Sequence, residues 1–406
     1  MPAEHPLYQA IVEQLQRTIG GAGVRATTIP RLALLVLGLL AGRTCVLSQL
    51  AVEVWALRVT RARSVEAVGR RLRRALNDRW LKARTCYEPV LKQVVPWERM
   101  SRDGQTLFLA LDESSQDDRL HLLRVSVVYW GTGVPLAWAL WEQNVPLADG
   151  EYWQKLRGVL DRVAAIVPAG VHVVVLADRA YDVAPFVDQL AARGWDWIVR
   201  VKAEGAGRFR DRAGGEHEVR TLIRTHVPRP GHRWRADGRL FKKAGWRPAA
   251  LVAYWEFDQQ TPLVVATSLR PSWQVLEWYG RRFWIEAEFR SEKALGWRWE
   301  AAQVQGIDHH ERLLVAMAWA TLLVVCLGLQ VAGAQLTRVT QRTPAGQPPP
   351  APRRPRFSLF RLGLNVTRAA LYRRTLPTLR WALADPDGPS WADRWLLHHA
   401  SLSPAA

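Results

Sequence analysis

The chain has 406 residues, with 56 Lys and Arg against 37 Asp and Glu, so its formal net charge is +19. That excess calls for a polyanionic partner, first nucleic acid and second an acidic membrane surface. The three cysteines are widely spaced, and the first residues lack the basic and apolar pattern of a signal peptide. We therefore expect neither a disulfide framework nor a zinc cluster, and we predict a cytoplasmic protein.

Residues 1–100 are predicted to form a helical domain, because apolar residues recur at spacings of three and four and no strand pattern interrupts them. The helix at about residues 64–78 holds a cluster of arginines that Glu66 and Asp78 are too few to balance. We predict that this helix contacts DNA phosphates, with a solvated helix face as the alternative. The arginines chosen for this role are Arg70, Arg71 and Arg74.

A second domain is predicted over residues 101–336, where the periodicity changes. Short apolar and alternating runs over residues 106–143 predict three consecutive antiparallel strands. Residues 151–202 then have the periodicity of helix, strand, helix and strand. This order indicates an α/β fold, in which helices flank a mixed sheet.

The rest of the chain is more varied. A polar, glycine-rich stretch at about residues 203–262 predicts a β-rich insertion, and a helix is expected at about 272–295. Leu313–Gly333 has about the 20 apolar residues that a membrane-spanning helix needs, but its flanks carry both signs of charge and no second span accompanies it. Membrane insertion is therefore not favoured. A Pro-rich basic linker is predicted at 337–357 and a small helical tail at 358–406.

Two aspartates follow apolar strands in the predicted sheet. Asp112 follows one such run and Asp178 another. If the two strands are parallel neighbours, both side chains leave the same edge of the sheet. Converging carboxylates from different elements are what a two-metal phosphoryl-transfer site needs. The alternative is that both acids begin turns, as Asp182 is expected to cap the helix that follows it.

The predicted helix at 272–295 supplies a third acid. Tyr279, Arg282, Glu286 and Lys293 are offset by 0, 3, 7 and 14 residues, which at about 100° per residue places them in one narrow stripe. Arg290 continues that stripe, whereas Glu288 and Glu292 point away from it, so Glu286 is the glutamate chosen for the site. The alternative is an ordinary amphipathic helix in which Arg282 and Glu286 form an i,i+4 ion pair.

These residues resemble a known family. Their Y-x2-R-x3-E-x6-K spacing matches every fixed position of the signature of DDE transposases of the insertion-sequence-four type, and the sequences around Asp112 and Asp178 look like that family's blocks around its first two catalytic aspartates. The resemblance covers about residues 100–335 and implies a catalytic core like that of ribonuclease H and retroviral integrase. The chain departs from the pattern at Ala180, where the family usually has Gly. If that position requires a positive φ, the alanine would be strained.

The resemblance implies a role for each matching residue. Asp112, Asp178 and Glu286 would hold two Mg²⁺ ions, for which Mn²⁺ can substitute, and Arg282 would suit bidentate contact with a phosphate. Tyr279, Arg282 and Lys293 would also contact phosphates of double-stranded DNA, and Arg290, which continues their stripe, is a further candidate. In relatives an aromatic residue of the insertion stacks on a flipped base, and the candidates here are Trp234 and Trp246. Relatives act as homodimers and bury a helix at the place of Leu313–Gly333, so no membrane partner is expected.

The sequence therefore predicts a DNA transposase that binds the ends of its mobile element and catalyses metal-dependent strand cleavage and transfer. Two alternatives stay open. One is a catalytically silent DNA-binding protein descended from a transposase. The other is a basic, membrane-associated protein, supported by the apolar helix and the positive charge alone.

Overall fold

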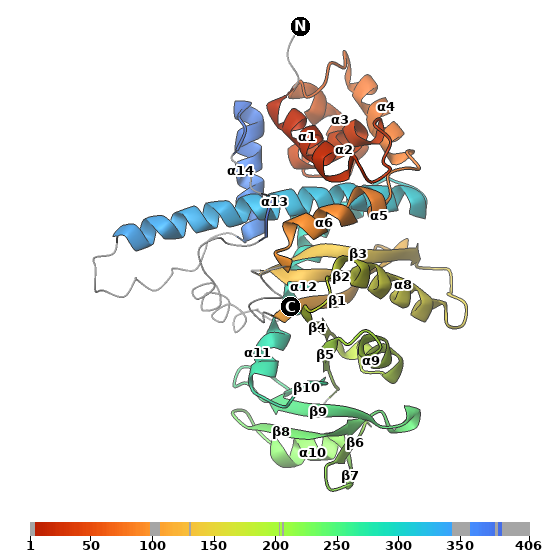
Figure 1. The fold of residues 1–406 in the computed structure, drawn as a ribbon, viewed down its shortest axis with the longest axis vertical. Coiled ribbons are helices and arrows are strands. Elements are labelled where there is room, and N and C mark those ends of the chain that lie inside the picture. The colour runs from red at the N-terminus through yellow and green to blue at the C-terminus, as the bar shows by residue number, and fades with distance from the viewer. Residues whose placement is uncertain are drawn as a thin grey trace.

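The helices and strands are arranged along one long axis in a computed structural model (Figure 1). A helical bundle lies at one end, a long helix crosses beneath it, a mixed sheet follows, and a strand-rich extension forms the other end. The described residues are 5–97, 106–129, 131–202, 204, 207–342, 358–377 and 381–383.

The N-terminal segment is helical, as its periodicity predicts. Its helices are α1 (Pro6–Ile19), α2 (Thr28–Gly42), α3 (Leu47–Ala56), α4 (Val65–Leu76), α5 (Ala83–Cys86) and α6 (Glu88–Val94). α4 begins at Ser64, whose hydroxyl accepts a hydrogen bond from the Ala67 amide and so satisfies one of the free donors of the first turn. Val68 and Leu72 face the bundle from this helix, which leaves its arginines on the outer side.

The central sheet begins with the three predicted antiparallel strands. Its first strands are β1 (Thr106–Gln116), β2 (Leu120–Tyr129), β3 (Thr132–Glu142), β4 (His172–Ala177) and β5 (Asp196–Arg200). β1 pairs antiparallel with β2 and parallel with β4, and β4 pairs parallel with β5. The described strands form one sheet in the order β3-β2-β1-β4-β5-β10-β9-β8-β6-β7.

The stretch after β5 extends this same sheet instead of forming a separate one. Its elements are β6 (Arg208–Asp211), β7 (Glu216–Glu218), α10 (Val219–His226), β8 (Arg233–Leu240), β9 (Arg247–Tyr254) and β10 (Leu263–Thr267). β10 joins the extension to the core by pairing antiparallel with β5. The strand that makes the join thus lies just beyond the predicted insertion, which ended at about residue 262.

Helices cover the sheet and connect its strands. They are α8 (Glu151–Ile166), α9 (Ala184–Ala191), α11 (Gln274–Gly280), α12 (Phe283–Arg290), α13 (Ile307–Arg342) and α14 (Leu359–Arg373). α8 packs against β2 and β3, α12 packs against β1, β2 and β3, and α14 packs along α13. α13 runs to Arg342, into the stretch where the sequence predicts a linker, and residues 343–357 and 384–406 lie outside the described part of the chain.

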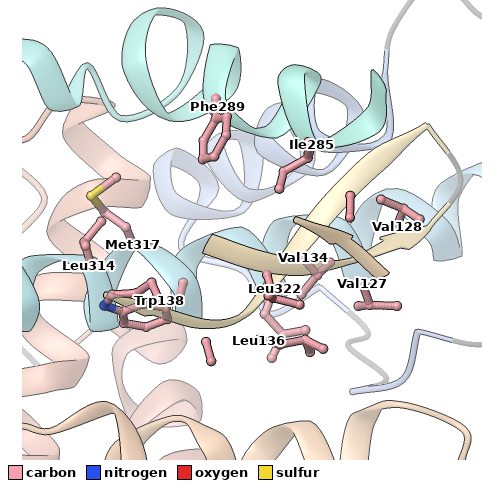
Figure 2. Packing of buried hydrophobic residues seen from close by; sticks show 14 of the residues in the cluster. Val127, Val128, Val134, Leu136, Trp138, Ile285, Phe289, Leu314, Met317 and Leu322 are labelled. Carbon is pink, nitrogen blue, oxygen red and sulfur yellow. The ribbon is translucent and has the colours of Figure 1, made fainter. Parts of the chain in front are cut away.

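α13 is the apolar helix that raised the membrane question. Within the described residues, Ile307–Ala332 is long and apolar enough to cross a membrane, and the bent pair α2 and α3 would count as a second span if taken together. However, 89% of the most apolar window of Ile307–Ala332 is buried inside the protein. Leu314, Met317 and Leu322 of α13 pack beside Trp138 and its neighbours on β3 (Figure 2). Packing between the helical bundle and the sheet therefore accounts for the apolarity of α13.

Candidate active site

Asp112 and Asp178 lie at matching positions on two adjacent strands. β1 and β4 are parallel, and their last pair of Cα partners is Leu111 with Ala177, so the two aspartates are the next residues on each strand. β1 does not end at Asp112, as the sequence suggested, because its ladder with β2 continues to Gln116. What ends there is the pairing with β4. The two aspartates thus stand where β1 and β4 separate, at one edge of the parallel part of the sheet.

The turn after β4 is shaped by Asp178 itself. Its carboxylate accepts a hydrogen bond of 2.8 Å from the Ala180 amide and caps a short 3-10 turn at Arg179–Tyr181. Ala180 lies inside this turn and is not one of the residues with positive φ, so alanine in place of glycine causes no backbone strain. The expectation that Asp182 caps α9 was wrong, because the capping position is occupied by Val183.

A tyrosine pair ties this turn to β1. Tyr152 on α8 and Tyr181 in the turn both donate to the Glu113 carboxylate, at 2.6 and 2.8 Å, and the two hydroxyl oxygens lie 3.2 Å apart. Burial raises the pKa of the Tyr152 and Tyr181 hydroxyls well above the usual tyrosine value, and the hydrogen bonds to Glu113 add to the rise, so both hydroxyls stay protonated donors. Glu113 follows Asp112 directly, and the network therefore fixes the two aspartate segments relative to each other. The sequence analysis did not identify these three residues.

The glutamate reaches the site through a bridging arginine. The Arg282 guanidinium donates to Asp112 Oδ2 at 3.1 Å and to Glu286 Oε1, so Arg282 lies between the two carboxylates. The Arg282 side chain is 8% exposed, whereas that of Glu286 is 43% exposed. The predicted i,i+4 ion pair of Arg282 and Glu286 is present, and the same guanidinium also binds Asp112 of β1.

The carboxylates influence one another electrostatically. The pKa of Asp112 is raised from 3.8 to about 6, chiefly by burial; the Arg282 charge opposes the rise, and Asp178 and Glu286 add to it. All three acids therefore contribute to one local field. That field favours a bound cation, because positive charge relieves both the burial penalty and the repulsion between carboxylates.

The predicted helix at 272–295 is broken where it approaches the site. α11 ends at Gly280, α12 begins at Phe283, and a π-helical turn occupies Ser291–Leu295. A helical projection that uses one fixed angle per residue therefore does not apply to the whole of residues 279–293. π-Turns often occur at functional sites.

The other residues of the predicted stripe differ in exposure. Tyr279 is fully buried, burial raises its pKa to about 12, and its hydroxyl has no hydrogen-bond partner with good geometry among the described residues. Lys293 lies in the π-turn, with Nζ 3.4 Å from Glu300 Oε1. Arg290 is exposed. Their contacts with DNA stay a prediction, and in this conformation Tyr279 does not present its side chain to solvent.

The two glutamates that the helical projection turned away from the site are both buried. Glu288 and Glu292 bind Arg124 of β2, at 2.9 and 2.6 Å. Burial raises the pKa of Glu288 to about 7, the Arg124 charge opposes the rise, and Glu292 adds to it. The sequence analysis missed Arg124, whose place in an apolar strand gives no signal of this pairing.

The predicted DNA-contact residues elsewhere fall into two groups. The exposed arginines on the outer side of α4 include Arg70, Arg71 and Arg74. Trp234 on β8 is half-buried and stacks on His226 with a centroid distance of 4.9 Å, and Trp246 is half-buried beneath Arg210 at 4.4 Å. Each tryptophan ring thus has one face covered by a neighbouring side chain, whereas Phe257, between β9 and β10, is 79% exposed.

The carboxylates of Asp112, Asp178 and Glu286 are the kind of ligand that binds a hard divalent cation, but they do not converge in this conformation. Three carboxylates supply the oxygen ligands that Mg²⁺ and Mn²⁺ prefer, and burial raises the pKa of Asp112 even though Arg282 lies beside it. Yet no group of three His, Cys, Asp or Glu side chains within the described ranges lies close enough together to hold a metal ion. Arg282 takes the central place between Asp112 and Glu286.

Comparison with known proteins gives one family model that matches part of the chain. Residues 147–323 match the model of the transposase DDE domain, a stretch that contains Asp178 and Glu286 but not Asp112. No curated protein is similar in sequence. A solved structure titled as a piggyBac transposase synaptic complex with hairpin DNA is similar over 97% of this chain and 82% of that chain, with 11% identity and a TM-score of 0.41.

Proposed function

We propose that this chain is a DNA transposase that cleaves and joins DNA strands with a DDE carboxylate site. The observation that carries the proposal is the register of β1 and β4, which sets Asp112 and Asp178 side by side, with Arg282 linking Glu286 to Asp112. The match of residues 147–323 to the transposase DDE domain supports it independently.

The order of the first five strands supports a ribonuclease H-like core. Three antiparallel strands are followed by two that run parallel to β1, in the order β3-β2-β1-β4-β5. The Y-x2-R-x3-E-x6-K spacing around Glu286 supports the insertion-sequence-four type. On this proposal β6, β7, β8 and β9 form the family's β-rich insertion, and β10 joins it to β5.

Asp112, Asp178 and Glu286 are the residues proposed to hold the cations. A bound pair of Mg²⁺ or Mn²⁺ ions would activate the attacking water or 3′-hydroxyl and stabilise the leaving oxygen. For the carboxylates to converge, Arg282 must leave its place between Asp112 and Glu286. A DNA phosphate competes well for a guanidinium, so phosphate binding by Arg282 would release both acids. This would couple the arrival of DNA to assembly of the site.

DNA is the proposed partner because of where the positive charge lies. Arg70, Arg71 and Arg74 are exposed on α4, and Arg290 is exposed beyond Glu286. With the net charge of +19, these surfaces suit sequence-independent phosphate contacts. A homodimer acting on paired element ends, in the cytoplasm, completes the proposal.

The proposed base-stacking role of Trp234 or Trp246 requires an exchange of partners. His226 covers Trp234 and Arg210 covers Trp246 in the free protein. A flipped base would have to displace one of them. Stacking of a base on an aromatic ring contributes about 1–3 kcal/mol, which is enough to replace such a contact.

The test is strand nicking of plasmid DNA that carries the sequences flanking the coding region, with Mg²⁺ or Mn²⁺. Asp112→Asn and Glu286→Gln are expected to bind this DNA in a gel-shift assay and not to nick it. Glu277→Gln is the matched control, because Glu277 is exposed on α11 beside the site. Variants that nick as well as the wild type would overturn the assigned site. A wild-type protein that binds the ends without nicking them would favour the catalytically silent alternative.

A further inference from the structure

A buried ion cluster lies directly behind the proposed carboxylate site. Arg124 on β2 is the Cα partner of Asp112 on β1. Its guanidinium nitrogen Nη1 donates to Glu288 Oε1 at 2.9 Å and to Glu292 Oε2 at 2.6 Å. Glu288 is two residues from Glu286, and Glu292 lies in the π-turn that follows α12. One arginine thus connects the strand beside Asp112 to the helix that carries Glu286.

The surroundings hold this cluster in one place. The side chains of Arg124, Glu288 and Glu292 are at most 2% exposed. The rings of Trp138 and Phe289 lie 5.9 and 5.5 Å from the guanidinium carbon, and Figure 2 shows Phe289 directed from α12 toward the sheet.

β3 leaves room for one of the two glutamates. A side chain at Gly133 of β3 would collide with the Glu288 carboxylate, so the missing Cβ allows this approach.

Such a cluster is poorly suited to stabilising the fold. Two carboxylates share one guanidinium, and Glu288 Oε2 and Glu292 Oε1 have no hydrogen-bond partner among the described residues. Replacing a buried ion group by apolar residues of similar volume is often neutral or stabilising. The cluster instead fixes the position and orientation of α12 on the sheet. Apolar contacts such as those of Ile285 and Phe289 allow a helix to slide or rotate, whereas charged hydrogen bonds have a preferred angle and length.

The two bonds are placed to control both degrees of freedom. Glu288 and Glu292 are one helical turn apart, so bonds to both of them fix the axial height of α12 and its rotation about its own axis. Glu286, at the half-exposed edge of the same helix, then has a fixed position relative to Asp112.

We propose that Arg124 is a positioning residue of the carboxylate site, which binds Glu288 and Glu292 and thereby holds Glu286 at the height and angle from which it can share a cation with Asp112 once Arg282 has left. This inference rests on the proposed function, because it assigns Arg124 to the same site. Arg124 touches neither DNA nor cation. Its effect reaches the site through α12.

Mn²⁺ binding, measured by electron paramagnetic resonance in the presence of a duplex carrying the element end, separates positioning from stability. The half-saturating Mn²⁺ concentration is the quantity to compare, since unfolded molecules lower the amplitude and leave that concentration unchanged. Arg124→Met, and the triple variant Arg124→Met, Glu288→Leu, Glu292→Leu, are expected to raise it by about 10- to 100-fold, as removal of residues that orient metal ligands does. Arg124→Lys keeps one buried charge and is expected to restore part of the affinity.

Arg162→Met is the matched control. Arg162 forms a largely buried ion pair with Glu88 of α6 at 2.7 Å and donates to the Trp138 carbonyl of β3, so its hydrogen bonds are to α6 and β3. It is expected to lower the unfolding temperature and to leave the half-saturating Mn²⁺ concentration unchanged. An Arg124→Met or triple variant with wild-type Mn²⁺ affinity would overturn the inference. Wild-type protein that neither binds Mn²⁺ nor nicks DNA would instead overturn the proposed function itself.

Discussion

Replacing Asp112 by Asn is expected to make the protein more stable at alkaline pH while removing its proposed activity. The Asp112 side chain is 17% exposed, and burial is the main reason that its pKa rises from 3.8 to about 6. The folded protein therefore holds the Asp112 proton more tightly than the unfolded chain. Its contribution to stability is full below about pH 4 and is lost as the pH rises through about 6.

The size of this effect follows from the shift. A rise of about two pKa units, at about 1.4 kcal/mol per unit, corresponds to a cost of about 3 kcal/mol for the ionised carboxylate. That value already includes the favourable charge of Arg282, which opposes the rise. Asn cannot ionise, yet its Oδ1 can keep the 2.9 Å hydrogen bond from the Glu113 amide. Above about pH 7, Asp112→Asn should thus be more stable than the wild type by about 2–3 kcal/mol.

Urea unfolding at about pH 5 and about pH 8 measures this difference. The stability gained by Asp112→Asn should be about half as large at the lower pH as at the higher, because at about pH 5 the unfolded chain has already released the Asp112 proton while the folded protein mostly keeps it. Asp149→Asn, at an exposed loop position, is the matched control and should change little at either pH. If Asp112→Asn is less stable than the wild type at pH 8, the ionised carboxylate is favoured by its surroundings and the reasoning is refuted.

Three further outcomes are expected. Arg282→Gln removes the guanidinium that lies 3.1 Å from Asp112 Oδ2 and so removes a positive charge that repels a cation. Mn²⁺ binding to the DNA-free protein, measured by calorimetry, should become tighter by about 1–3 kcal/mol, a value that is reduced because solvent screens the exposed Glu286. Weaker binding would contradict this. Ala180→Gly should not raise the unfolding temperature, because Ala180 is already unstrained; a clear rise would show strain. Alanine at three exposed positions of α4 should reduce the slope of log K against log salt by about 0.9 for each phosphate that the helix no longer neutralises, and an unchanged slope would exclude that helix from the interface. These positions are Arg70, Arg71 and Arg74.

Local periodicity was enough to predict the elements that bring the two aspartates together. The antiparallel β1, β2 and β3 and the apolar β4 each have a clear pattern, and parallel neighbours necessarily place Asp112 and Asp178 at one edge. The extent of β1 was not predictable, because whether a strand continues past an acid depends on its partner β2. Likewise, β10 belongs to the core sheet only through its pairing with β5, which no local pattern encodes.

The supporting contacts of the site were not predictable for a similar reason. Arg124 occupies one position in an apolar strand, and its two partners come from residues more than 160 positions later in the chain. Glu113 meets two tyrosines from two other elements. The helical projection correctly separated Glu286 from Glu288, only two residues away. Its single angle per residue does not apply to Lys293, which lies in a π-turn, so the direction of that side chain could not be read from the sequence.

The central claim, that Asp112 shares divalent cations with Asp178 and Glu286, is tested most directly by changing the chemistry of one ligand. A thiolate is a poor ligand for Mg²⁺ and a better one for softer cations such as Mn²⁺. Plasmid nicking by Asp112→Cys is therefore expected to be lost in Mg²⁺ and regained in Mn²⁺. Full nicking in Mg²⁺, or a loss that Mn²⁺ does not relieve in a folded protein, would contradict the claim.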